Sequence, residues 1–251
     1  MPNLVAHIGF GLDCIGLEED SLISNNLGSF LLGCCSPDVR IITKMSRDNT
    51  HFVPISNKII GTGTHNLFKE NPKLLNKESL NSVTKSFLAG YILHLVADET
   101  WIIDMYRPYF GNRNVFPNKI IGNIMDRAMQ LDMDRETHLQ HENFSGYTHE
   151  LAIDFDDIEI DFISNESFKE FTDTIKRVFS NAFDWSRLIF MIRRQYPDKD
   201  SGMAESLAND FIKNLPDSLE DLYHQVPKKE IKAYRANIIS SWQSLIKEYL
   251  L

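Results

Sequence analysis

A histidine and an aspartate stand four residues apart in the middle of a long apolar stretch. They are His94 and Asp98, and the stretch extends from Gly90 to Ile103. Residues at this spacing lie one above the other on the same face of an α-helix. An ionised carboxylate in apolar surroundings is costly unless it is paired or binds a metal, and a shared cation satisfies both groups. The pair therefore predicts a metal site, while a core histidine hydrogen-bonded to Asp98 is the alternative.

Three more side chains of ligand type precede this pair along the chain. His7 lies beside the apolar stripe of a predicted first helix, Asp38 follows Pro37, and His51 stands before Phe52. Histidine and carboxylate side chains are ligands that Zn²⁺ accepts, and carboxylates also suit Mn²⁺ or iron. Helical bundles build interior metal sites from ligands on several elements. Taken singly, His7 fits a partly exposed helix and Asp38 an ordinary turn, so spacing alone does not assemble the set.

The order of these residues resembles that of the bacterial zinc-dependent phospholipase C family, whose all-helical members are distantly related to P1-type zinc nucleases. The motifs that carry the resemblance are His7, Ser36–Pro37–Asp38, Thr50–His51–Phe52 and residues 93–98, within roughly residues 4–130. The resemblance implies that His51, His94 and Asp98 hold one metal ion. It implies that Asp98 bridges to a second ion, which His7 helps to bind. Asp38 would be a ligand, or the base that orients the attacking water.

Two departures from the family pattern predict fewer metal ions than the three of the secreted enzymes. These enzymes carry a histidine six residues after the bridging aspartate, where this chain has Asp104. A later histidine and glutamate fall on Asn118 and Gly122 in a gap-free reading. We therefore expect one or two Zn²⁺ ions, with Mn²⁺ or iron as alternatives. Further candidates for metal or substrate contacts are Asp104, Asp126, His65, Arg47 and Arg107.

Helical periodicity dominates the elements that must position these side chains. It predicts helices over residues 4–15, 26–35, 79–106 and 118–131, with Ser79 as an N-cap and a loop from residue 107. Residues 151–162 alternate apolar and acidic side chains, which indicates a short strand or an extended loop. The rest, 167–251, is helical and broken near its prolines. We expect one all-α domain over 1–251, a multi-helix bundle of the phospholipase C/P1 nuclease type. Its metal-site core covers about 1–135 and its C-terminal helical extension about 163–251.

Composition narrows the possible partners. The formal net charge of −9 argues against a nucleic-acid scaffold, and the pairs Arg193–Arg194 and Lys228–Lys229 are too few to build a basic face. No segment reaches the roughly 18 to 20 apolar residues of a membrane span. The N-terminus lacks a basic region followed by an apolar block, and three cysteines make no disulfide framework. We expect a soluble, cytoplasmic protein.

The function that these residues favour is metal-dependent hydrolysis of a phosphate ester by a metal-activated water. The substrate would be a small-molecule phosphate ester or a phospholipid headgroup. An acidic surface disfavours docking on anionic bilayers, which favours a soluble substrate. Two alternatives stay open. One is a metal enzyme of different chemistry on the same scaffold, such as a di-iron protein, and the other is a non-catalytic, metal-stabilised interaction module.

Overall fold

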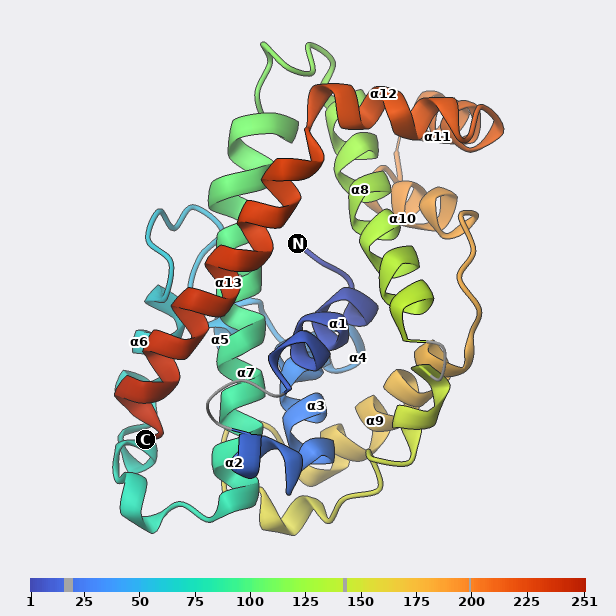
Figure 1. Cartoon of the computed structure of the whole chain (residues 1–251). Coiled ribbons are helices and arrows are strands. Elements are labelled where there is room, and N and C mark those ends of the chain that lie inside the picture. The colour runs from blue at the N-terminus through green and yellow to red at the C-terminus, as the bar shows by residue number, and fades with distance from the viewer. Residues whose placement is uncertain (16–19, 142–143, 199) are drawn as a thin grey trace.

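The computed structural model describes residues 1–15, 20–141, 144–198 and 200–251, and every regular element within these ranges is a helix (Figure 1). The all-α prediction is therefore confirmed. The α-helices are α1 (Leu4–Cys14), α2 (Asp20–Ser24), α3 (Leu27–Cys35), α4 (Arg40–Thr43), α5 (Asp48–His51), α6 (Thr62–Glu70), α7 (Ser82–Thr100), α8 (Lys119–Gln140), α9 (Asn165–Ser180), α10 (Arg187–Gln195), α11 (Ser201–Lys213), α12 (Asp217–Gln225) and α13 (Lys228–Tyr249). Short 3₁₀ turns are η1 (Ser36–Val39), η2 (Pro72–Leu75), η3 (Lys77–Ser79), η5 (Phe144–Thr148) and η6 (Phe155–Asp157), and η4 (Trp101–Phe110) is a π-helix.

Helix α7 is buried along most of its length and packs directly against α3. Glycines at the contact allow this close approach. A Cβ atom on Gly90 would lie 2.0 Å from the carbonyl oxygen of Phe30, and one on Gly33 would lie 2.1 Å from that of Phe87. The two helix backbones therefore touch, and residues one turn beyond Gly90 on α7 face the end of α3.

Both ends of α7 differ from the sequence prediction. The N-cap is Asn81, whose side-chain oxygen accepts the N–H of Thr84 at 2.7 Å, whereas Ser79 lies in η3. At the other end the chain continues directly into the π-helix η4, so the predicted loop over 107–117 starts only at Gly111, and the prediction was wrong for Pro108, which is helical. A proline excludes the α-helical hydrogen bond at its position, and the chain widens its turn there instead of ending the helix. Such π segments occur frequently at functional sites.

The last helix, α13, crosses α7 and covers its outer side (Figure 1). Two buried side chains of α13 donate hydrogen bonds to backbone carbonyls of α7. The Tyr234 hydroxyl donates to Ala97 at 3.1 Å, and the Trp242 indole N–H donates to Ala89 at 2.8 Å. The C-terminal part of the chain thus supports the helix that carries His94 and Asp98.

The acidic stretch at 151–162 forms no strand in the described structure. It contains only the turn η6, and the carbonyl of Asp157 accepts hydrogen bonds from Asn81 and Thr84 at the start of α7. The alternation of apolar and acidic residues belongs to a loop in which Ile158 is buried and Asp157 is exposed. The strand alternative was wrong because these backbone groups bond to α7 rather than to a neighbouring strand.

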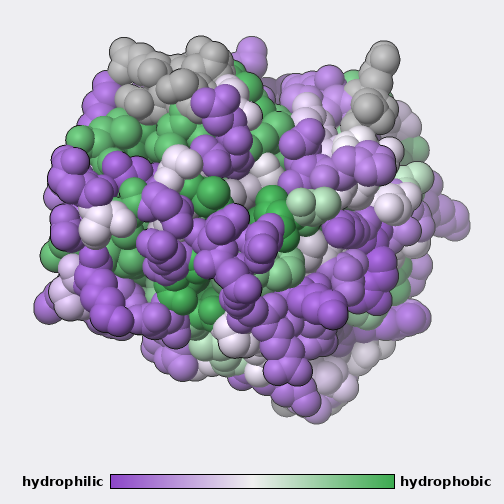
Figure 2. Space-filling view, turned by 90° about the horizontal axis from the view of Figure 1, so that it is seen from below, coloured by the Kyte–Doolittle hydropathy of each residue, from purple (hydrophilic) through white to green (hydrophobic). Residues whose placement is uncertain are grey.

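The face shown in Figure 2 is mostly hydrophilic, with apolar areas scattered between polar side chains. Among the described helices, none combines the length and apolar character needed to cross a bilayer.

Candidate metal centre

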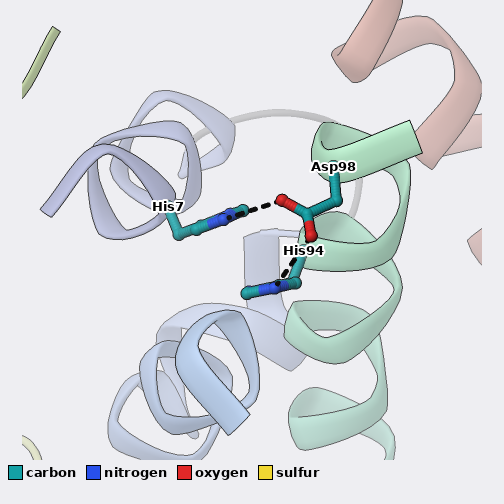
Figure 3. Close-up of side chains that lie close together, drawn as sticks. All are labelled: His7, His94 and Asp98. Atoms are coloured by element: carbon teal, nitrogen blue, oxygen red, sulfur yellow. Dashed lines mark ion pairs between the residues drawn. The ribbon is translucent and has the colours of Figure 1, made fainter. Parts of the chain in front are cut away.

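The five predicted ligands lie on α7 and on three other elements that meet beside it. His7 comes from α1, Asp38 from η1, His51 from the last residue of α5, and His94 and Asp98 from successive turns of α7. The histidines and Asp98 are at most 1% exposed, and the side chain of Asp38 is 15% exposed. Figure 3 shows His7 and His94 directed toward the carboxylate of Asp98.

The carboxylate of Asp98 lies between the three imidazoles. Its Oδ1 atom is 3.4 Å from Nε2 of His7, and its Oδ2 atom is 3.1 Å from Nε2 of His51 and 3.8 Å from Nε2 of His94. The rings of His7 and His94 are stacked, with centroids 3.7 Å apart. Asp38 lies beside His51, with Oδ1 4.0 Å from Nε2 of His51. Each oxygen of Asp98 thus faces a different set of nitrogens.

Two triplets of ligand atoms are each compact enough to surround an ion, and they are alternatives because both contain His94. They are His7/His94/Asp98 and Asp38/His51/His94, and within each triplet the ligand atoms lie within 4.8 Å of one another.

The orphaned atoms of the cluster fit a cation. Nε2 of His7, His51 and His94 and Oδ1 of Asp98 are buried and have no hydrogen-bond partner among the described residues. Buried polar atoms are nearly always satisfied, and several orphans around one point call for an explanation. A divalent ion bound by imidazole nitrogens and carboxylate oxygens would satisfy them, and this donor set suits Zn²⁺.

Outer hydrogen bonds orient two of the imidazoles. Nδ1 of His94 lies 2.8 Å from the backbone carbonyl oxygen of Cys34, which can only accept, so the proton of neutral His94 sits on Nδ1. Nδ1 of His51 lies 3.0 Å from the hydroxyl of Thr50. This pattern leaves the Nε2 lone pairs turned inward, as in metal sites whose histidines donate their other N–H to a carbonyl. Neither Cys34 nor Thr50 carried a signal for this role in the sequence.

The electrostatics keep the ligands in the forms that bind cations. Burial by itself would raise the pKa of Asp98, but the adjacent imidazoles of His51 and His7 and the charge of Arg47 outweigh it and hold the pKa well below its usual range. Burial, together with the nearby His7, holds the pKa of His94 well below its usual value. At neutral pH the site therefore presents an ionised carboxylate and a neutral His94.

Arg47 is part of this cluster rather than a surface residue. Its Nη2 donates to Oδ2 of Asp98 at 3.0 Å, and its side chain is 9% exposed. The pair is close to fully desolvated, so Arg47 offsets much of the negative charge that Asp98 brings into the interior.

Two other acidic candidates have structural partners. Oδ1 of Asp126 accepts the indole N–H of Trp101 at 2.9 Å, and Oδ2 of Asp104 accepts the side-chain amide of Asn237 at 2.7 Å. In the described parts of the chain, neither belongs to the two ligand triplets. Their roles as additional ligands remain predictions without support from the geometry.

The remaining two candidates also lie outside the triplets. His65 is half-exposed, and its Nδ1 lies 2.5 Å from the hydroxyl of Tyr249. Arg107 donates from Nη2 to the carbonyl oxygen of Ile55 at 2.7 Å. Their contacts connect segments of the fold, and the described structure gives neither of them a position among the ligand atoms.

A buried carboxylate that the sequence analysis missed holds the start of α6 against α7. Glu99 accepts the backbone N–H groups of Gly61 at 2.5 Å and Gly63 at 2.6 Å. Burial raises the pKa of Glu99 to about 7 despite these hydrogen bonds. A Cβ on Gly63 would lie 2.7 Å from both Glu99 and the carbonyl oxygen of His51, so α6 packs directly on the His51 turn. The Gly-x-Gly spacing of Gly61 and Gly63 was the signal in the sequence for such a close contact.

A second missed carboxylate anchors α1. Oδ1 of Asp134 accepts the N–H of Ala6 in the first turn of α1 at 3.1 Å, and Oδ2 lies 3.1 Å from both Asn3 Nδ2 and Arg187 Nη1. A carboxylate at a helix N-terminus satisfies an unpaired N–H and complements the helix dipole. Burial raises the pKa of Asp134 to about 6, with Arg187 opposing that rise. Asp134 thereby fixes the helix that carries His7.

A cavity of about 530 Å³ opens beside Asp38. Residues of the N-terminal segment, η1, α4, α8, α9 and α10 line it. Its volume is in the range of small-molecule sites. Asp38 belongs both to the cavity wall and to a ligand triplet, so the cavity borders the cluster at this residue.

Comparison with known proteins supports the resemblance inferred from the motifs. The family model described as zinc-dependent phospholipase C matches residues 7–189. The match starts at His7, covers all five candidate ligands and ends inside α10, well beyond the segment 4–130 that the motifs suggested. No curated protein and no solved structure shows significant similarity to the chain.

Proposed function

The chain belongs to the zinc-dependent phospholipase C family, and from this premise we propose that it hydrolyses phosphate esters with zinc held by its buried His/Asp cluster. One observation supports the proposal above all. Four buried ligand atoms, from His7, His51, His94 and Asp98, converge without hydrogen-bond partners in the described structure.

The hydrogen-bonding of His94 limits how the ions can be arranged. Its Nδ1 is engaged by Cys34, so it has one free nitrogen and can serve one ion at a time. Asp98 has two oxygens on different sides of the cluster and can bridge. We propose that His51, His94 and Asp98 would hold one zinc ion and that His7 and Asp98 would hold a second. Mn²⁺ or iron would be accepted by the same donors.

When bound, zinc lowers the pKa of a coordinated water and stabilises negative charge on phosphoryl oxygens. The chain supplies the remaining parts of the reaction. Asp38 lies where the cavity meets the ligands, and in this proposal its carboxylate accepts the proton of the attacking water. The water oxygen forms a bond to phosphorus, the ester P–O bond breaks, and the departing alcohol takes up a proton. A diester thus yields an alcohol and a phosphate monoester.

Elemental analysis of the purified protein, paired with hydrolysis of bis(p-nitrophenyl) phosphate, tests this proposal. We expect one or two zinc ions per chain, loss of hydrolysis on chelation, and recovery on adding Zn²⁺. Bound iron with oxygen uptake and no hydrolysis would establish different metal chemistry instead. His94→Ala should lose metal, whereas His65→Ala, a half-exposed histidine outside the triplets, should keep it. Metal-free protein in which His94→Ala leaves thermal stability unchanged would point to a non-catalytic module.

A further inference from the structure

The wall of the cavity beside Asp38 is rich in arginine, although the chain as a whole carries a net charge of −9. Four arginines line it: Arg40, Arg127, Arg187 and Arg194. Asp38 is the one acidic side chain among the described residues that line the same cavity. Such a reversal of charge in one concave site raises the local concentration of anionic ligands.

Two of these arginines are engaged by the protein. Nη1 of Arg187 lies 3.1 Å from the buried carboxylate of Asp134. Arg127 donates to the side-chain oxygens of Gln130 at 2.9 Å and Gln195 at 3.4 Å. These contacts fix two guanidinium groups in the wall.

The other two arginines have unused donors. Nε of Arg40 is buried and has no hydrogen-bond partner among the residues that the structure describes. Arg194 is exposed and forms no hydrogen bond or ion pair with the described part of the chain. A guanidinium presents its donors as a planar fork that matches phosphate or carboxylate oxygens. The unused donors on α4 and α10 therefore suit an anionic group of the ligand.

The neighbouring residue shows that this arrangement is specific to the cavity. Arg193 stands next to Arg194 on α10 but faces Glu205 of α11, to which its Nε donates at 2.7 Å. Arg193 is not part of the cavity wall. One arginine of the pair is thus committed to a helix contact, and the other is left to the cavity.

The rim of the cavity is apolar. Ile41 is 41% exposed and Phe190 is 68% exposed, and both line it. An ester with an apolar portion would find contacts there, in addition to the cationic wall.

We propose that this cavity selects phosphate esters that carry a second anionic group besides the phosphate to be hydrolysed. The inference rests on the proposed function, because Asp38 connects the cavity to the zinc ligands. The phosphate at the metal centre and the second anion near Arg40 and Arg194 would be held at once. A substrate with a cationic headgroup would place its positive charge against the same arginines and be disfavoured. Anionic lipid headgroups and free soluble esters share this chemistry.

Binding of two matched probes tests the proposal independently of turnover. Inositol 1-phosphate and inositol 1,4-bisphosphate differ by one phosphate, and calorimetric titration into the zinc-loaded protein gives both Kd values. We expect the bisphosphate to bind at least about tenfold more tightly, since hydrogen bonds to charged groups are the strong ones. Arg194→Gln should reduce this ratio to about threefold or less. Arg193→Gln, with the same charge change on the same helix, should leave the ratio as in the unmodified protein.

Equal affinity for the two probes, or equal effects of Arg193→Gln and Arg194→Gln on the ratio, would overturn the proposal. Measurements of turnover then distinguish a lipid from a soluble substrate, and the proposed hydrolysis from the proposed anion selection. Dihexanoyl phosphatidylinositol and its 4-phosphate are compared with the deacylated glycerophospho compounds. A higher kcat/KM for the 4-phosphate supports the proposal. If kcat/KM is higher for the lipids, the ligand is a lipid headgroup, and if it is higher for the deacylated compounds, the ligand is a soluble ester. Equal kcat/KM values with and without the 4-phosphate refute the proposed anion selection and leave the proposed hydrolysis standing. If none of these compounds is hydrolysed but the binding preference is intact, the proposed phosphoesterase activity is refuted and selective anion binding is established.

Discussion

Replacing Asp98 by asparagine changes the charge at the centre of the cluster while keeping the shape of the side chain. An amide offers one acceptor oxygen in place of two, so it cannot bridge the two groups of nitrogens that face Oδ1 and Oδ2. Structural zinc sites are worth about 10 to 16 kcal/mol over four ligands, so one ligand accounts for roughly 3 kcal/mol. We therefore expect zinc affinity to fall by about a hundredfold or more in Asp98→Asn.

The same change should destabilise the metal-free protein. Arg47 loses the carboxylate that lies 3.0 Å from its guanidinium and is left as an unpaired cation in the interior. Removing one partner of a buried pair costs about 3 to 5 kcal/mol. For a chain of this length that corresponds to a fall in Tm of roughly 10 °C.

A double variant separates these two effects. Arg47→Met in the Asp98→Asn background removes the stranded charge, so much of the lost stability should return while zinc affinity stays low. The assays are chelator-competition titration of zinc and thermal unfolding in excess chelator. If Asp98→Asn keeps stoichiometric zinc at unchanged affinity, the proposed bridge is wrong. If its metal-free Tm is also unchanged, the burial argument for the pair with Arg47 fails as well.

Three more predictions address the base, the helix contact and the anchor of α1. Asp38→Asn should retain part of its zinc but slow turnover by about 100-fold or more, as steady-state kinetics with metal analysis will show; unchanged turnover would exclude it as the base. Gly90→Ala should lower the free energy of unfolding by about 3 kcal/mol, because its Cβ would strike the carbonyl of Phe30, whereas Gly202→Ala meets nothing within 4 Å and serves as the control in urea titrations. The pKa of Asp134 is about 6 in the folded protein, above its ordinary 3.8, so the folded state binds the proton more tightly than the unfolded state. The free energy of unfolding should therefore fall as pH rises from about 4 to 6, by up to about 3 kcal/mol. Urea unfolding across this range should show that slope in the unmodified protein relative to Asp134→Asn, and parallel curves would contradict it.

Local patterns were sufficient to predict most helices and one pair of ligands. The apolar spacing around His7 predicted residues 4–15 as a helix, and α1 spans Leu4–Cys14. The i,i+4 relation of His94 and Asp98 is likewise a property of the helix alone. Bringing His51 and Asp38 to the same point depends on tertiary packing, which no local pattern encodes. Only the resemblance to a family joined them in advance.

The features that were missed depend on contacts between distant segments. Asp134 caps α1 from 128 residues along the chain, so no local capping motif marks it. The π-helix around Pro108 contradicts the usual inference that proline ends a helix. Arg194 was set aside as half of a pair too small for nucleic acid, and only the cavity beside Asp38 gives it another role.

The five proposed zinc ligands and about half of the cavity wall come from different stretches of the sequence. The five proposed ligands all precede Glu99, whereas α8, α9 and α10 supply the wall residues between Arg127 and Gln195. Mutational drift in that later stretch can change which ester is accepted while the reactive chemistry is inherited intact. A directed-evolution library confined to positions such as Thr174, Phe190 and Arg194 is therefore the place to retarget this scaffold.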